Sequence, residues 1–149
     1  MMEEKRIFDQ ILKREQGERI SSVRTEMQNG MEKHVGIYRD ENSLKEGCRI
    51  IDDLKTRLSN AIVEDKDHVY NTELVAALEL DFMLDVAETI PYSAMQRRES
   101  RGAHYRTDYS KRDDANFLKH SMAYKTNGPP RIDYSPVMIT RWKPEERVY

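Results

Sequence analysis

The sequence predicts an all-α protein: an antiparallel up-down three-helix bundle, similar in architecture to a spectrin repeat, followed by a largely irregular C-terminal tail that contains short extended segments. Three observations support this prediction. Apolar residues recur at intervals of three and four over three long stretches. Short polar connections separate the stretches, so successive helices should run antiparallel. Beyond Gly102 the helical period disappears.

The N-terminal part should consist of an arm and the first bundle helix. Over residues 1–17, apolar residues lie among charges and Gly17 ends the pattern, which indicates an arm or a short helix over 3–16. The bundle is expected to span residues 18–103. Its first helix, residues 18–34, carries one apolar face made of Ile20, Val23, Met27 and Met31.

The second helix has the most regular apolar stripe in the chain, over residues 44–62. Asn42 or Ser43 suits its N-cap, and Glu46 follows Ser43 at the spacing of a capping box. The stripe consists of Leu44, Cys48, Ile51, Leu54, Leu58 and Ile62.

The third helix should begin after a cap at Asn71 or Thr72 and run toward residue 100. Pro91 lacks an amide hydrogen and clashes with the preceding turn, so we expect a kink or a break there. The expected core face consists of Leu74, Leu78, Phe82, Val86 and Ile90.

The tail, residues 104–149, is expected to be mostly extended. A short turn is predicted at 113–120, and Gly128-Pro129-Pro130 should form the tip between two extended segments. Residues 1–96 carry 13 Lys and Arg against 20 Asp and Glu, whereas residues 97–149 carry 12 against 7. Acidic residues interleave with the basic ones and with many Tyr side chains, so we expect a protein surface as the partner and no nucleic acid.

Composition limits the remaining classes of function. With 149 residues the chain is the size of one domain with a tail. Its single cysteine, Cys48, excludes an internal disulfide framework, and we expect it to act as a buried small apolar residue. No apolar run approaches the roughly 20 residues of a membrane span, so we expect no direct membrane insertion.

One segment carries a recognisable motif, Glu99-Ser100-Arg101-Gly102-Ala103-His104. It resembles the ESRGAH signature of the succinate dehydrogenase and fumarate reductase flavoprotein family. The blocks MQNGMEKHVGIYRDENSLKEGC, NTELVAALEL and RDDANFLKHSMAY resemble that family in the same order. The resemblance covers residues 20–149 and identifies the chain with the C-terminal helical domain of that subunit.

The resemblance implies a complete subunit that holds FAD, interconverts succinate and fumarate, and exchanges electrons with an iron-sulfur subunit. It also implies a cytoplasmic location, peripheral to the inner face of the membrane through the complete complex. The family's catalytic and flavin-binding motifs lie upstream, and neither GxGxxG nor an HGANR-like segment is present here. We therefore expect no catalytic or cofactor-binding residue, and expect the fragment alone to be inactive. Its partners would be the flavin-binding and capping domains of the same subunit and the iron-sulfur subunit.

The motif itself predicts a structural and docking role. Gly102 suits a backbone conformation that ends a helix, and the charges of both signs around it should pair internally. Arg101 and Arg106 are expected to fix the tail either to the bundle or to the flavin domain, because a guanidinium binds carboxylates and carbonyls with several donors. The predicted motif residues are Glu99, Ser100, Arg101, Gly102, His104, Arg106 and Asp108.

The histidines, acidic pairs and methionines favour structural roles over catalytic or metal-binding ones. His104, beside Glu99 and Asp108 in sequence, is expected to sit in a salt-bridge network and not to act as a general acid or base. The histidines lack the paired spacing of zinc ligands, so we expect no metal site. Asp113-Asp114 should mark a helix N-terminus. The methionines at helical spacing should fill the core instead of forming a groove, namely Met27, Met31, Met83 and Met95.

Two alternatives remain open. The C-terminal domain of L-aspartate oxidase has a similar ESRG-H exit, but the continuation at residues 112–120 favours the dehydrogenase and reductase branch. A stand-alone helical interaction module is the other alternative. In either case, apolar surface exposed on the isolated fragment would favour a homodimer.

Overall fold

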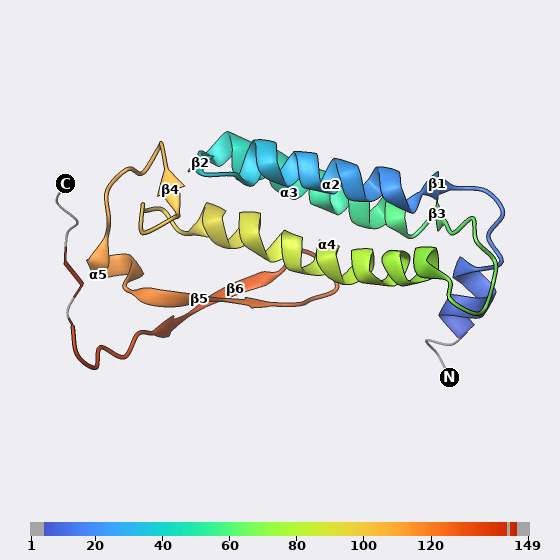
Figure 1. The fold of residues 1–149 in the computed structure, drawn as a ribbon. Helices are drawn as coiled ribbons and strands as arrows, with labels where there is room; N and C mark the ends of the chain where they lie inside the picture. The colour runs from blue at the N-terminus through green and yellow to red at the C-terminus, as the bar shows by residue number, and fades with distance from the viewer. Residues whose placement is uncertain (1–4, 143, 146–149) are drawn as a thin grey trace.

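The computed structural model describes residues 5–142, 144 and 145, and within them the protein is mainly helical, as the sequence predicted. The three longest helices lie side by side, and successive helices run in opposite directions (Figure 1). Each of them contacts the other two. In the described part of the chain, no helix is both long and apolar enough to cross a membrane. The three helices are α2 (Ile20–Val35), α3 (Glu41–Leu58) and α4 (Thr72–Gln96).

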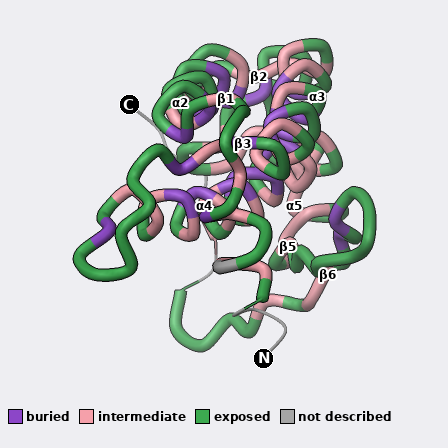
Figure 2. The backbone as a smooth tube through the Cα atoms, turned by 90° about the vertical axis from the view of Figure 1, so that its right-hand side faces the viewer, coloured by how far each residue is buried: buried purple, intermediate pink, exposed green. Residues whose placement is uncertain are grey.

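The core lies where these helices face one another (Figure 2). Val23, Leu54 and Leu80, one from each helix, are fully buried. Burial of such a side chain stabilises the fold by about 1.5–3 kcal/mol. The methionines belong to this packing, as predicted: Met27 is buried, while Met31, Met83 and Met95 pack against core clusters.

Cys48 is buried in α3, as expected for a small apolar residue. Burial raises the pKa of its thiol to about 12, and the nearby Asp52 carboxylate adds to the rise. The thiol therefore stays protonated at neutral pH, which makes it a poor nucleophile.

The helix starts differ in part from the predictions. Asp40 caps α3, since its carboxylate accepts hydrogen bonds from the amides of Asn42 and Ser43 at 2.9 and 3.0 Å. The predicted caps, Asn42 and Ser43, are wrong because an acidic residue two positions earlier reaches both amides. The predicted cap of α4 is confirmed at Asn71, whose side chain accepts from the Leu74 amide at 2.7 Å.

Short parallel strand pairs lie at both ends of the helices. β1 (Glu18–Arg19) pairs with β3 (Ala61–Ile62), so α3 ends at Leu58 and not at the predicted Ile62. Gly17 is needed for this pairing, because a Cβ atom at that position would lie 2.3 Å from the Asn60 carbonyl oxygen. At the other end, β2 (Tyr38–Arg39) pairs with β4 (Tyr105–Arg106).

The N-terminal segment forms a shorter helix than predicted. A π-helix, η1, spans Arg6–Ile11. Residues 3 and 4 of the predicted helix lie outside the described residues. Leu12, just after η1, is buried in the main core, so this segment packs on the bundle.

Helix α4 departs most from its predicted form. It runs unbroken through Pro91, which is buried, and ends at Gln96, short of the predicted residue 100. The predicted core face is wrong in part, because Phe82, Val86 and Ile90 are 69%, 65% and 40% exposed. The face that is buried consists of Ala77, Leu80, Leu84, Ala87, Glu88, Pro91 and Ala94.

The tail contains the expected short turn and extended segments. Helix α5 (Asp114–Phe117) starts at Asp113, whose carboxylate caps the Asn116 amide at 3.0 Å, as expected for an acidic pair at a helix start. Strands β5 (Lys119–Tyr124) and β6 (Arg131–Pro136) form an antiparallel hairpin around the Gly-Pro-Pro tip. The hairpin lies along α4 (Figure 1).

Candidate functional site at the exit of the last long helix

The ESRGAH segment forms a tight loop a few residues after α4 ends. Gly102 has φ +57°, in the left-handed region that glycine adopts without steric cost. On either side of it, Arg101 and His104 exchange two backbone hydrogen bonds of 2.8 and 3.0 Å. Gly102 therefore shapes this loop and does not end the helix, which corrects the prediction made from its position.

Arg106 is the centre of one half of the site, and its side chain is fully buried. The guanidinium donates to the Ala94 and Met95 carbonyl oxygens, in the last turn of α4, at 2.9 and 3.2 Å. It also donates two bonds of 2.7 Å to the Asp108 carboxylate and reaches Glu41, in the first turn of α3, at 3.3 Å. One arginine thus caps α4 and ties its end to the start of α3.

Asp108 completes this half of the site. Its carboxylate accepts from the Glu41 backbone amide at 3.0 Å as well as from Arg106. The hydrogen bonds with Arg106 hold the pKa of Asp108 below its ordinary value, against an opposing contribution from burial. Asp108 is therefore an ionised partner at neutral pH.

Glu99 is the centre of the other half, and its side chain is fully buried too. Arg101 contacts both carboxylate oxygens at 2.9 and 3.0 Å, Arg97 contacts one of them, and the Asp113 amide donates at 2.8 Å. Burial opposes ionisation of Glu99, but the bonds from Arg101, the Asp113 amide and Arg97 outweigh it, so the pKa lies below its ordinary value. The buried charge is thus fully compensated.

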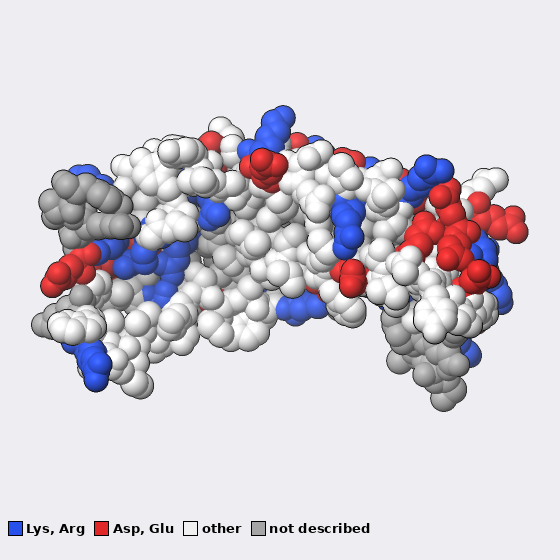
Figure 3. Space-filling view, in the orientation of Figure 1, with Lys and Arg blue, Asp and Glu red and all other residues white. Residues whose placement is uncertain are grey.

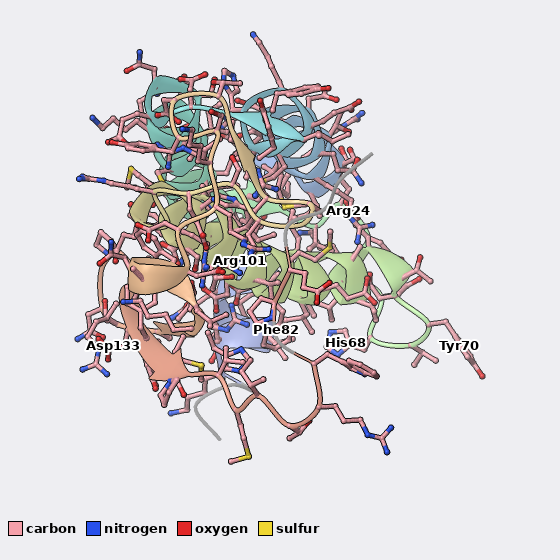
Figure 4. All side chains as sticks on the ribbon, turned by 90° about the vertical axis from the view of Figure 1, so that its left-hand side faces the viewer. Arg24, His68, Tyr70, Phe82, Arg101 and Asp133 are labelled. Atoms are coloured by element: carbon pink, nitrogen blue, oxygen red, sulfur yellow. The ribbon has the colours of Figure 1, made fainter. Side chains whose placement is uncertain are left out.

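Two arginines connect Glu99 to the tail. Arg101 forms a 2.6 Å ion pair with Asp114 in α5. Arg97 donates to the Phe117 carbonyl oxygen at 2.9 Å, to the Lys119 carbonyl oxygen and to the Ser121 hydroxyl. Figure 4 shows Arg101 in this region, between the end of α4 and the tail.

Ser100 links the two halves through the backbone. Its hydroxyl accepts from the Arg106 amide at 2.8 Å and donates to the Tyr109 carbonyl oxygen at 2.8 Å. The Ser100 amide in turn donates to the Lys111 carbonyl oxygen at 3.1 Å. A hydroxyl is well suited to this position, because it donates and accepts at the same atom.

His104 does not lie in the predicted salt-bridge network with Glu99 and Asp108. Its Nδ1 lies 3.0 Å from an Arg39 guanidinium nitrogen and its Nε2 lies 3.1 Å from the Arg97 carbonyl oxygen. Since arginine only donates, Nδ1 accepts and Nε2–H donates, which is the neutral imidazole. Burial lowers the pKa of His104 and the nearby Arg39 charge lowers it further, although the bond to the Arg97 carbonyl opposes this.

The structure therefore brings all seven predicted motif residues into one connected cluster. Sequence reasoning missed their partners Arg39, Glu41, Arg97 and Asp114. Arg97 lies two residues before the motif, and its charge was a signal that it shares with Arg98. Arg39 and Glu41 each lie 65 residues before the partner they contact, in a block that resembles the family but that did not indicate these contacts. In the described residues, no group of three metal-ligating side chains converges.

Comparison with known proteins agrees with this architecture. The family model for the fumarate reductase flavoprotein C-terminus matches residues 24–149. The fumarate reductase flavoprotein subunit of Haemophilus influenzae is 49% identical over 138 residues, which make up 92% of this chain and 23% of the relative.

Solved structures give the same result. A mutant of Escherichia coli quinol fumarate reductase matches with a TM-score of 0.90 at 39% identity, over 98% of this chain and 25% of that one. The Sdh1 complex of Mycobacterium smegmatis in its apo form matches with a TM-score of 0.82 at 27% identity, over 93% and 24%. The chain spans about a quarter of the length of these relatives. It belongs to the family of fumarate reductase flavoprotein C-terminal domains.

Proposed function

We propose that this chain is the C-terminal structural and docking domain of a succinate dehydrogenase or fumarate reductase flavoprotein subunit. In this role it supports FAD-dependent interconversion of succinate and fumarate and electron transfer to an iron-sulfur subunit, at the inner face of a membrane. The observation that carries the proposal is the inward pairing of the motif's charges: Glu99 and Arg106 are fully buried and bonded within the chain. Side chains that are buried and bonded in this way stabilise the structure and have no hydrogen-bonding capacity left for a substrate.

The chain's own residues do not fit FAD. Dinucleotide sites use a glycine-rich turn between a strand and a helix of a parallel sheet. In the part of the chain that the structure describes, parallel pairing is limited to two pairs of two-residue strands. The chain's six glycines never come closer than six positions apart. The flavin, which supplies the redox chemistry when bound, therefore belongs to the upstream part of the proposed subunit.

We propose three parts of the chain with different roles, on the basis of the ion pairs that connect them. Residues 18–103 form the bundle and residues 104–149 form the tail. They are joined by the exit cluster, which consists of the seven motif residues and their partners Arg39, Glu41, Arg97 and Asp114. Arg106 connects the ends of two bundle helices, and Arg101 connects Glu99 to Asp114 in the tail. We expect this junction to give the domain one fixed shape against which the upstream part can assemble.

Reconstitution tests the proposal. The 149-residue chain is mixed with the separately expressed upstream three quarters of the Haemophilus influenzae relative, and complex formation and dye-coupled succinate oxidation are measured together. We expect a complex whose turnover exceeds that of either part alone, with the isolated chain free of flavin and inactive. A chain that neither binds the upstream part nor raises its turnover would contradict the proposal and favour a stand-alone module.

The role of the exit cluster is tested in the same assay. Arg101→Gln keeps much of the side-chain length and removes the charge that binds Glu99 and Asp114, so we expect weaker assembly. Arg19→Gln is the matched control, because Arg19 pairs with Glu64 only at the surface. If Arg101→Gln binds the upstream part as tightly as the control variant does, Arg101 does not fix the domain in the form that assembles.

A further inference from the structure

Helix α4 is apolar on two faces, and only one of them is covered. The buried face packs into the bundle, whereas Val75, Phe82, Val86 and Ile90 are 53%, 69%, 65% and 40% exposed. These residues stand 7, 11 and 15 positions after Val75, which places them along one side of the helix over roughly 22 Å. A row of exposed apolar side chains of this size on a helix is typical of a surface that another protein part covers.

Four of the five acidic residues of α4 lie off this stripe, whereas Glu79, four positions after Val75 and three before Phe82, lies on it. All five are held by contacts inside the chain: Glu73 accepts from the Glu64 and Asp65 amides, and the other four pair with Arg or Lys side chains. The helix has no Lys or Arg of its own. The charge of Glu79 is already paired with Arg24, so a partner that covers Phe82, Val86 and Ile90 need not supply a counter-charge.

The stripe borders a shallow groove of about 410 Å³, which Met27 of α2 helps to line. The α4 part of its lining is Phe82, Met83, Val86, Ala87 and Ile90. On the face drawn in Figure 3, charged side chains gather mainly toward the two ends, and the middle, over α2 and α4, carries few of them. Arg24 and Glu79, 3.5 Å apart, form a charged pair beside Met83. The ring of Phe82 and the branched side chains of Val86 and Ile90 form an exposed surface of the kind that anchors a protein interface, and the thioethers of Met27 and Met83, which also belong to the core packing, line the groove beside them.

We infer that this groove, centred on Phe82 and Val86, is the surface on which the upstream part of the same subunit docks through an apolar patch of its own. This inference rests on the proposed function. The length of chain outside the structure argues for this occupant: the family model describes a C-terminus, and relatives extend this sequence by about three quarters of their own length. A second copy of the chain is the competing occupant.

The test uses the reconstitution partner described above and a matched pair of double variants. Phe82→Gln/Val86→Gln removes the centre of the groove while keeping good helix formers on exposed positions. Ile37→Gln/Val69→Gln removes two residues that are 71% and 70% exposed at the ends of the bundle. Circular dichroism and thermal unfolding verify that both variants fold as the unmodified chain does, and titration calorimetry gives the Kd for the upstream part.

We expect the Kd of Phe82→Gln/Val86→Gln to rise at least tenfold and that of the control to change less than twofold. Equal binding by all three chains would overturn the assignment of the groove and leave the proposed function standing. If the unmodified chain instead fails to bind and sediments as a dimer that only the groove variant dissociates, the occupant is a second copy. Failure to bind by a chain that sediments as a monomer would overturn the docking surface and the proposed function together.

Discussion

The bundle and the exit cluster are built by different physical means. In the bundle, three helices share a core of aliphatic side chains, and the stabilising contribution grows with the apolar area removed from water. At the exit, the two fully buried side chains are charged: Arg106 pairs with Asp108 and Glu41, and Glu99 pairs with Arg97 and Arg101. Apolar packing is tolerant of small shifts, but a buried charge is stable only while each partner stays in place. The bundle thus gives the domain its stability, and the exit gives the tail a defined position.

The largest effect should come from the bundle. Leu54→Ala deletes a fully buried side chain from the centre of α3, and we expect a loss of about 2–5 kcal/mol, from the lost transfer energy and the cavity left behind. The free energy of unfolding in urea measures it. The loss should appear in the bundle and the tail together, since the tail is anchored to α4. A change below 1 kcal/mol would mean that the core is not packed as described.

A smaller, more local effect should follow from Glu99→Gln. The amide has nearly the same size but no charge, so Arg97 and Arg101 lose their common counter-ion in a buried site, at a cost of about 2–3 kcal/mol. Amide hydrogen exchange should speed up in β5 before it does in α3. Glu79→Gln is the control, because Glu79 is exposed and its pairing with Arg24 should matter little. Uniform acceleration over both regions would show that the exit does not position the tail independently.

His104 should make stability depend on pH. Its pKa in the folded protein lies below the ordinary value, so the unfolded chain binds the proton more readily. Stability should therefore be full above about pH 7 and fall as the pH drops through the ordinary histidine pKa toward the lowered one. His104→Gln should flatten this part of the profile, measured as urea midpoints between about pH 5 and 7. An unchanged slope would mean that His104 is not the neutral link between Arg39 and the Arg97 carbonyl.

The smallest effect is expected where the hairpin meets α4 at the surface. Lys125 pairs with Asp85, but the lysine side chain is 74% exposed, and Lys55 binds the same carboxylate. Lys125→Ala should therefore change the free energy of unfolding by about 0–1 kcal/mol. Thermal unfolding of the single variant is sufficient to measure it. A loss as large as that of Glu99→Gln would place the main anchor of the hairpin here and not at Arg97.

The difference between the apolar bundle and the charged exit also explains which features could be predicted from the sequence. Periodicity located α2 and α3 within a few residues, because Val23 and Leu54 lie on stripes with one apolar side. It also located α4, but it chose the wrong side of that helix as part of the core face, because Phe82 and Val86 fit a helical period as well as Leu80 and Leu84 do. The missing information is which side is covered by this chain, and no local pattern contains it.

At the exit, the motif was found but its geometry was not. Residue type singled out Arg101 and Arg106 as groups with several donors, but it placed Gly102 at a helix end, whereas Gly102 shapes the loop between Arg101 and His104. The partners Arg39 and Glu41 are brought in by the packing of β2 and α3, at separations of 65 residues in both pairs. His104 was assigned to carboxylates close to it in sequence, whereas the fold places it against a guanidinium and a carbonyl.

The burial of Arg106 also bears on how fast the domain should unfold. Its acceptors come from the last turn of α4, the first turn of α3 and the exit loop, so the guanidinium gains nothing by leaving water until these three have met. We therefore expect its contacts to form late in folding. Contacts that form after the transition state slow unfolding and leave the folding rate almost unchanged. Loss of the Arg106 contacts is expected to shorten the time that the domain stays folded more than to change how quickly it forms.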